Sequence, residues 1–153
     1  LLGKQALLVP YHNYAMEQPG RSLDELLKPG HLNPDLTRWE MHRVWVVQAT
    51  LRPGKRHVHV KRRFYLDEDS WQALIVENQD ARGELWHVNL AFTKNAYEAA
   101  TLAPVNLVFH DLIARSYSAL GLRNNEQAPR QFLLAAPPES YFTPASLRRK
   151  GTQ

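Results

Sequence analysis

The stretch that decides the fold is MHRVWVVQATLRPGKRHVHVKRRFYLDEDSWQALIVENQDARGELWHVNLAF, residues 41–92. Four of its segments alternate apolar and polar residues, the period of a β-strand with one buried face. Turn-forming runs at 52–55, 67–70 and 80–83 separate the segments and favour an antiparallel meander. The apolar residues expected on one shared face are Trp45, Val47, Ala49, Leu51, Val58, Val60, Phe64, Leu66, Trp71, Ala73, Ile75, Trp86, Val88, Leu90 and Phe92.

Symmetric turns set the expected pairing of these strands. Across the acidic turn, Leu66 is expected opposite Trp71, and Phe64 opposite Ala73. By the same reasoning Arg62 lies opposite Ile75 and Ile75 opposite Val88, while Ala73 lies opposite Leu90. A slip of one residue would turn a whole apolar set to the other side of the sheet, so the shared face depends on these registers.

The remaining elements are short. Further strands are expected at 4–11, 105–110 and 116–122. Ser22 with Glu25 forms a capping box before a helix at 23–28. Thr143 followed by Pro144 begins a second helix that ends at Lys150. The predicted fold class is therefore mostly β (α+β): a curved antiparallel sheet or half-barrel with short helices.

Composition predicts a globular protein with a real core. The chain has 153 residues, of which 44% are hydrophobic and 10% aromatic. No apolar run approaches the ~20 residues of a membrane span, so contact with a membrane is expected to be peripheral at most. The chain has no cysteine, which excludes disulfides and thiolate chemistry. The net charge of +4 is compatible with an anionic partner and is more often only a solvated basic surface.

A basic stripe is the first candidate for chemistry. His57, His59, Lys61 and Arg63 alternate along the second strand and should share its outer side. Two of them are cations that would repel a metal ion, and no third ligand follows from the spacing, so no metal site is predicted. The tryptophans fall on the other face, away from these cations, which argues against nucleic-acid binding.

Catalysis is not predicted either. The carboxylates of Asp67, Glu68 and Asp69 occupy a tight turn, where such residues are common for backbone reasons. No serine elbow and no glycine-rich phosphate loop is present in the sequence. We therefore expect neither an enzyme nor a cofactor.

The apolar face has two interpretations. It is either an ordinary core covered by the helices at 23–28 and 145–150, or the wall of a cavity for an apolar ligand. Two helices of about two turns each are thin cover for four strands, which favours the cavity.

Four segments carry a resemblance to a known family. They are PGRSLDELLKPGHLNPDLTRWEMHRVWVVQATLRPGKRH (19–57), RRFYLDEDSWQ (62–72), DARGELWHV (80–88) and FTPASLRRKG (142–151). Together they resemble a proteobacterial family of unknown function whose members are labelled outer-membrane lipoprotein-sorting proteins. The resemblance implies a half-barrel similar to the periplasmic lipoprotein carriers of the Lol type, whose concave apolar face holds acyl chains. It also implies that residues 1–153 are one domain or the C-terminal portion of a larger periplasmic half-barrel protein of the Gram-negative cell envelope.

The sequence and the resemblance together give the hypothesis of a non-enzymatic periplasmic carrier or chaperone, with a lipid or acylated lipoprotein as its partner. Arg62 shares the apolar face by parity and is expected to meet a headgroup or pair with Glu77. The residues expected to face the ligand are Trp45, Val47, Val60, Arg62, Phe64, Trp71, Ile75, Trp86, Val88 and Leu90.

The alternative is a protein-interaction module. It would dock to an envelope transporter or an outer-membrane protein through the basic stripe of His57, His59, Lys61 and Arg63. A carrier should purify with bound lipid, whereas a docking module should purify without it.

Overall fold

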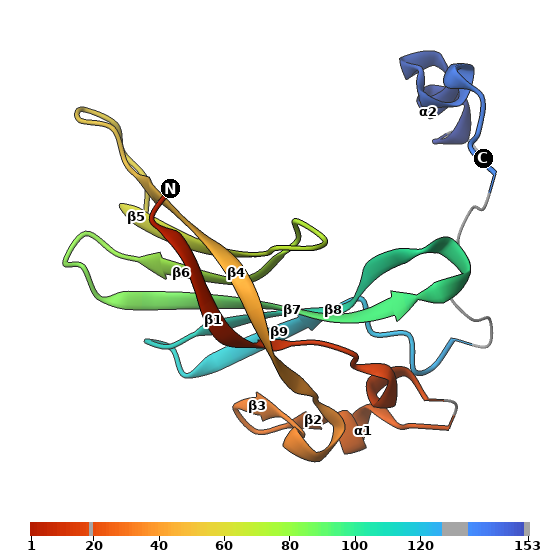
Figure 1. The fold of residues 1–153 in the computed structure, drawn as a ribbon, viewed down its shortest axis with the longest axis horizontal. Helices are drawn as coiled ribbons and strands as arrows, with labels where there is room; N and C mark the ends of the chain where they lie inside the picture. The colour runs from red at the N-terminus through yellow and green to blue at the C-terminus, as the bar shows by residue number, and fades with distance from the viewer. Residues whose placement is uncertain (19, 127–134, 152–153) are drawn as a thin grey trace.

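The computed structural model, which describes residues 1–18, 20–126 and 135–151, is built around one curved sheet (Figure 1). The sheet has seven antiparallel strands in the order β1-β4-β5-β6-β7-β8-β9. It does not close, and β1 and β9 are its edges. This confirms the predicted class of a mostly β protein with a curved antiparallel sheet. The strands are β1 (Gly3–Pro10), β4 (Trp39–Thr50), β5 (Lys61–Asp67), β6 (Ala73–Gln79), β7 (Leu85–Ala96), β8 (Thr101–Asp111) and β9 (Ser116–Leu120).

The segment between β1 and β4 covers one end of the sheet. It forms α1 (Leu23–Leu26), the two-stranded sheet of β2 (Leu27–Lys28) and β3 (His31–Leu32), and a 3₁₀ helix, Pro34–Leu36. The predicted capping box is confirmed at Ser22, but the helix is shorter than expected because the chain pairs as β2 from Leu27 onward. Residues from this segment and the sheet form one hydrophobic cluster: Met16, Leu26, Leu32, Leu36, Phe92, Val105 and Val108.

The second predicted helix forms but does not cover the sheet. α2 (Pro144–Lys150) begins as expected, with the Thr143 hydroxyl accepting a hydrogen bond from the Ser146 N–H at 3.3 Å. It packs against the 3₁₀ helix Glu139–Phe142 and stands apart from the sheet (Figure 1). The expected cover therefore comes from the N-terminal segment alone among the described residues. No helix among them is long and apolar enough to cross a membrane.

A β-bulge between β5 and β6 changes the predicted register. Leu66 pairs with Ala73 and Tyr65 with Ile75, so Leu74 is an extra residue. The predicted pairs of Leu66 with Trp71 and of Phe64 with Ala73 are wrong. Trp71 lies in the turn before β6, in the left-handed region at φ 60°, and is 65% exposed. A symmetric turn cannot anticipate an inserted residue.

The buried face of β4 and β5 is the reverse of the one predicted. Val44, Val46 and Tyr65 are buried on the concave side, while Trp45, Val47 and Phe64 lie half-buried on the convex side. Both sets alternate, so the sequence pattern alone could not choose between them. Val58, also expected inside, precedes β5 and is 59% exposed. The concave side forms a second cluster: Val9, Tyr11, Val44, Val46, Tyr65, Leu74 and Leu102.

The β6–β7 pairing differs from the prediction by two residues. Ile75 pairs with Leu90, and Val88 pairs with Glu77. A register shift of two residues leaves every side chain on the same side of the sheet. Ile75, Val88 and Leu90 therefore share one face, as expected. A second bulge leaves Trp86 as an extra residue, because Asn78 pairs with His87 and Gln79 with Leu85.

The reversal of the β4 faces can be measured with two equivalent substitutions. Val44 is fully buried and Val47 is half-buried on the other side of the same strand. We expect Val44→Ala to lower the free energy of unfolding by roughly 2–3 kcal/mol, from lost burial and the cavity left behind. Val47→Ala should cost less than half as much. Urea denaturation of both variants is the measurement, and a larger cost for Val47→Ala would contradict the observed faces.

Candidate functional site

An open groove lies on the concave side, between the sheet and the covering segment. Its volume is about 360 Å³. Its apolar wall combines β7 with the first residue of β4 and the end of β3, and the Trp39 ring meets the Phe92 ring edge-on at 5.9 Å. Trp39 remains 41% exposed, so an apolar ring is open to solvent in the groove. The lining residues are His31, Leu32, Pro34, Thr37, Trp39, Leu90, Phe92 and His110.

His110 adds little positive charge to this groove at neutral pH. Burial, together with the nearby charge of His31, lowers the pKa of His110. The His110 ring also stacks on Tyr117 at 5.5 Å. The groove therefore presents mainly uncharged surface, which suits an apolar ligand.

The structure divides the residues that were expected to face a ligand. Ile75, Val88 and Leu90 lie on the concave side, and of these only Leu90 lines the groove. The convex side holds Trp45, Val47, Arg62 and Phe64. Trp71 stacks on Trp45 at 6.2 Å, Trp86 stacks on His87 at 4.4 Å, and Val60 lies just before β5 with its N–H donating to the Gln79 carbonyl.

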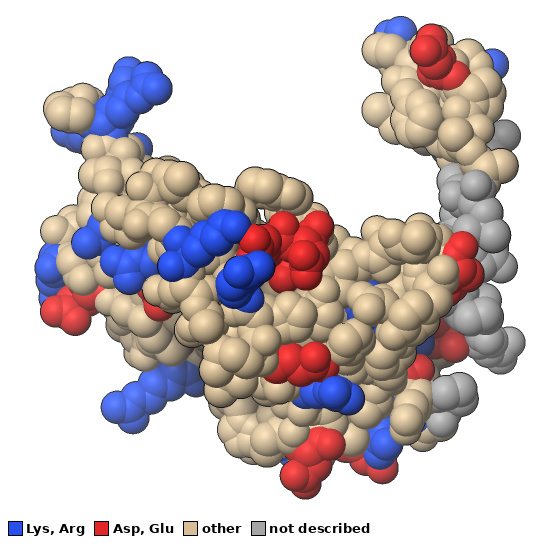
Figure 2. Space-filling model, in the orientation of Figure 1, with Lys and Arg blue, Asp and Glu red and all other residues tan. Residues whose placement is uncertain are grey.

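The predicted basic stripe is divided as well. Lys61 and Arg63 belong to β5 and share the side of Tyr65, where Arg63 lies 3.6 Å from Glu77. The expected pair of Arg62 with Glu77 is therefore wrong. His57 and His59 precede β5 and contact Arg62, on the opposite side. On the face shown in Figure 2, acidic side chains lie among the basic ones.

The structure builds a polar cluster on the convex side that sequence spacing did not reveal. His59 Nε2 lies 2.8 Å from His87 Nδ1, and His87 Nε2 lies 3.4 Å from an Asp111 oxygen. The Trp86 indole donates to the other oxygen of Asp111 at 3.1 Å. Burial, followed by the charges of His87, Arg62 and His57, lowers the pKa of His59.

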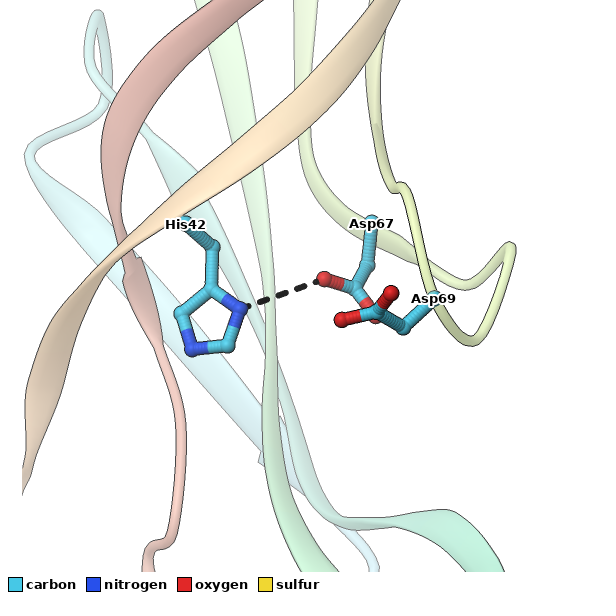
Figure 3. Close-up of side chains that lie close together, drawn as sticks. All are labelled: His42, Asp67 and Asp69. Carbon is cyan, nitrogen blue, oxygen red and sulfur yellow. Dashed lines mark ion pairs between the residues drawn. The ribbon is translucent and has the colours of Figure 1, made fainter.

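A second cluster joins His42 of β4 to Asp67, the last residue of β5, and to Asp69 in the turn that follows (Figure 3). One ligand atom from each lies within 4.8 Å of the others, and His42 Nδ1 is 3.5 Å from Asp67 Oδ1. The Tyr11 ring stacks on His42 at 3.9 Å. Burial, and then the negative charges of Asp67, Asp69 and Glu40, raise the pKa of Tyr11 to about 12.

Sequence reasoning missed this second cluster. His42 was one of several dispersed histidines, and the two aspartates were read as turn residues. The cluster could have been found from the correct β4–β5 register. This register pairs Val44 with Asp67 and so places His42 beside the turn. A cavity of about 450 Å³ adjoins the cluster, with Tyr11 and Asp69 in its wall.

The lowered histidine pKa values predict that the protein loses stability in mild acid. His59 and His110 have folded pKa values below their usual value of about 6.5, so the unfolded chain binds more protons as the pH falls through that value. The free energy of unfolding should therefore decrease between pH 7.5 and pH 5.5, above the range in which most carboxylates titrate.

Urea denaturation at the two pH values measures this loss. His59→Gln keeps a hydrogen-bonding side chain and removes one titrating group, so the loss should be smaller in this variant. An equal loss in both proteins would exclude His59 as a source of the pH dependence.

Comparisons with known proteins agree with the resemblance noted in the sequence. The chain is 42% identical over 153 residues to the uncharacterized Pseudomonas aeruginosa protein PA3922, covering all of this chain and 33% of that protein. The chain thus spans about a third of that relative. Two solved structures are similar at low identity. One is a proposed outer membrane lipoprotein-sorting protein domain from Vibrio parahaemolyticus, with 15% identity and a TM-score of 0.41 over 70% of this chain and 49% of that one.

The other solved structure is a DUF1329 family protein from Desulfovibrio piger. It is 11% identical, with a TM-score of 0.44 over 95% of this chain and 71% of that one. The family described as protein of unknown function (DUF1329) matches residues 1–148. The chain therefore belongs to the DUF1329 family.

Proposed function

We propose that this protein is a non-enzymatic carrier or chaperone that holds the acyl chain of a lipid or lipoprotein in the groove on its concave side. In this proposal it works in the periplasm of a Gram-negative cell and receives its cargo from, or passes it to, a partner in the envelope. The observation that carries the proposal is the open groove of about 360 Å³, with Trp39 and Leu90 in its wall.

The shape of the sheet supports this function. The sheet is open, and its described cover lies over one end only, so the concave side has an apolar surface that is neither closed off nor fully exposed. Beyond the groove, Ile75 and Val88 are half-buried on the same side of β6 and β7, and the ion pair of Glu77 with Arg63 borders them. Ligand sites are typically concave and mostly apolar, with volumes of ~300–1,000 Å³, and this groove lies at the lower end of that range.

The docking alternative is less well supported. Its surface was the stripe of His57, His59, Lys61 and Arg63, and the strand pairing places the two histidines and the two cations on different sides. A flat complementary partner could not contact all four at once.

Binding of a dansyl-labelled fatty acid tests the carrier function. Leu90→Gln places an amide in the apolar groove, where an unpaired amide costs ~1–3 kcal/mol, so the Kd should rise roughly tenfold. Leu107→Gln is the matched control, because Leu107 lies next to Val108, the partner of Leu90, and therefore faces the convex side. Its Kd should stay unchanged.

Two results would count against the groove as the acyl site. No fluorescence change with the unmodified protein, or an equal loss of binding in both variants, would exclude the groove as the acyl site. Native mass spectrometry of the purified protein, followed by organic extraction, is the complementary measurement. It should detect a bound lipid whose amount is lower in Leu90→Gln.

A further inference from the structure

We propose that His42, Asp67 and Asp69 form a binding site for a divalent transition-metal ion of the zinc class, separate from the acyl groove. The three side chains come from β4, the end of β5 and the following turn, and Figure 3 shows them pointing toward one another. Their ligand atoms, one imidazole nitrogen and two carboxylate oxygens, lie within 4.8 Å of one another. This is a donor set that zinc accepts.

A buried oxygen of Asp67 that has no hydrogen-bond partner supports a cation site. Asp67 is fully buried, and its Oδ2 accepts hydrogen bonds from the Ser70 N–H and hydroxyl at 2.9 and 2.6 Å. These bonds stabilise the turn and account for one oxygen only. The other oxygen, Oδ1, is buried without a hydrogen-bond partner. A buried, unsatisfied carboxylate oxygen is costly, and a bound cation would remove that cost.

The nearby lysine and arginine side chains do not supply this charge. Lys4 and Arg43 both bind Glu68, at 2.5 and 2.7 Å, and Arg38 binds Glu40 at 2.7 Å. Within the described part of the chain, no lysine or arginine pairs with Asp67 or Asp69. Two carboxylates this close repel each other, and a doubly charged ion between them would turn that repulsion into attraction.

His42 is held in an orientation that suits a ligand. Its ring stacks on Tyr11, its Nδ1 faces Asp67 Oδ1, and its Nε2 lies 3.8 Å from a Glu40 oxygen. A carboxylate near the second ring nitrogen is a common feature of metal-binding histidines, although 3.8 Å is longer than the hydrogen bond that fixes the tautomer in such sites. Glu40 is held in place in turn by His12 and Arg38, each at 2.7 Å.

The distance between the ligand atoms of His42 and Asp67 matches that of two ligands on one zinc ion. Ligands at ~2.0–2.2 Å in a tetrahedral arrangement lie roughly 3.3–3.6 Å apart, and His42 Nδ1 is 3.5 Å from Asp67 Oδ1. Asp69 is exposed on a turn, so it can move by the additional distance. It also lines the cavity of about 450 Å³, which gives the ion an entry path and leaves its remaining position open to water.

Calorimetric titration of EDTA-treated, dialysed protein with ZnCl₂ tests the site. We expect one equivalent to bind and the melting temperature to rise. Asp69→Asn and His42→Gln should each raise the Kd by at least roughly a hundredfold, because each removes a direct ligand. Asp69 and His42 are only partly buried or exposed, so these changes should leave the fold intact, whereas Asp67→Asn would also disturb the turn.

Two controls isolate the cluster. Glu68→Gln changes a carboxylate of the same turn that contacts Lys4 and Arg43, and His59→Gln changes the other histidine cluster. Both should bind zinc as the unmodified protein does, and millimolar Mg²⁺ should not compete. No zinc uptake, unchanged affinity in Asp69→Asn and His42→Gln, or loss only in His59→Gln would overturn the proposal.

Discussion

The extra residue in β6 is the constraint on which the arrangement of the sheet depends. Leu74 inserts between the pairs Leu66–Ala73 and Tyr65–Ile75, and its side chain is fully buried in the core. Because of this insertion, Ile75 shares the concave side with Tyr65 rather than with Phe64. A bulge also bends its strand and increases the local twist, which suits a sheet that curves without closing. The side on which Ile75 lies, and with it that of its partner Leu90 in the groove, follows from this local change.

Curvature and cover together leave part of the concave side open, and the proposed carrier function uses this part. The segment between β1 and β4 buries Phe92 and Val108 at one end of the sheet. At the edge of that cover, Trp39 and Leu90 are left in an open groove. An apolar surface in this condition can accept a ligand without breaking existing contacts, since part of it is still in contact with water. The proposed carrier function rests on this incomplete burial.

The two polar clusters depend on strand pairing rather than on local sequence. His42 and Asp67 are brought together because Val44 pairs with Asp67. His59 meets His87 because Asn78 pairs with both Arg62 and His87, which puts His87 on the side of Arg62, where His59 lies. In both clusters a buried or half-buried group lies next to several charges, which is why the pKa of Tyr11 rises and that of His59 falls. The sequence contained every member of both clusters, but their spacing along the chain carried no signal.

The sequence by itself determined much of the local structure: the order of the strands, the capping box at Ser22 and the Thr143 cap of α2 were predicted correctly, because each depends on neighbours within a few residues. It also identified the family, through long local motifs. Only the tertiary structure decided which face of β4 is buried. Both faces carry alternating apolar residues, so the choice between Val44 and Val47 depended on pairing energies across the sheet and on an inserted residue that no local pattern encodes.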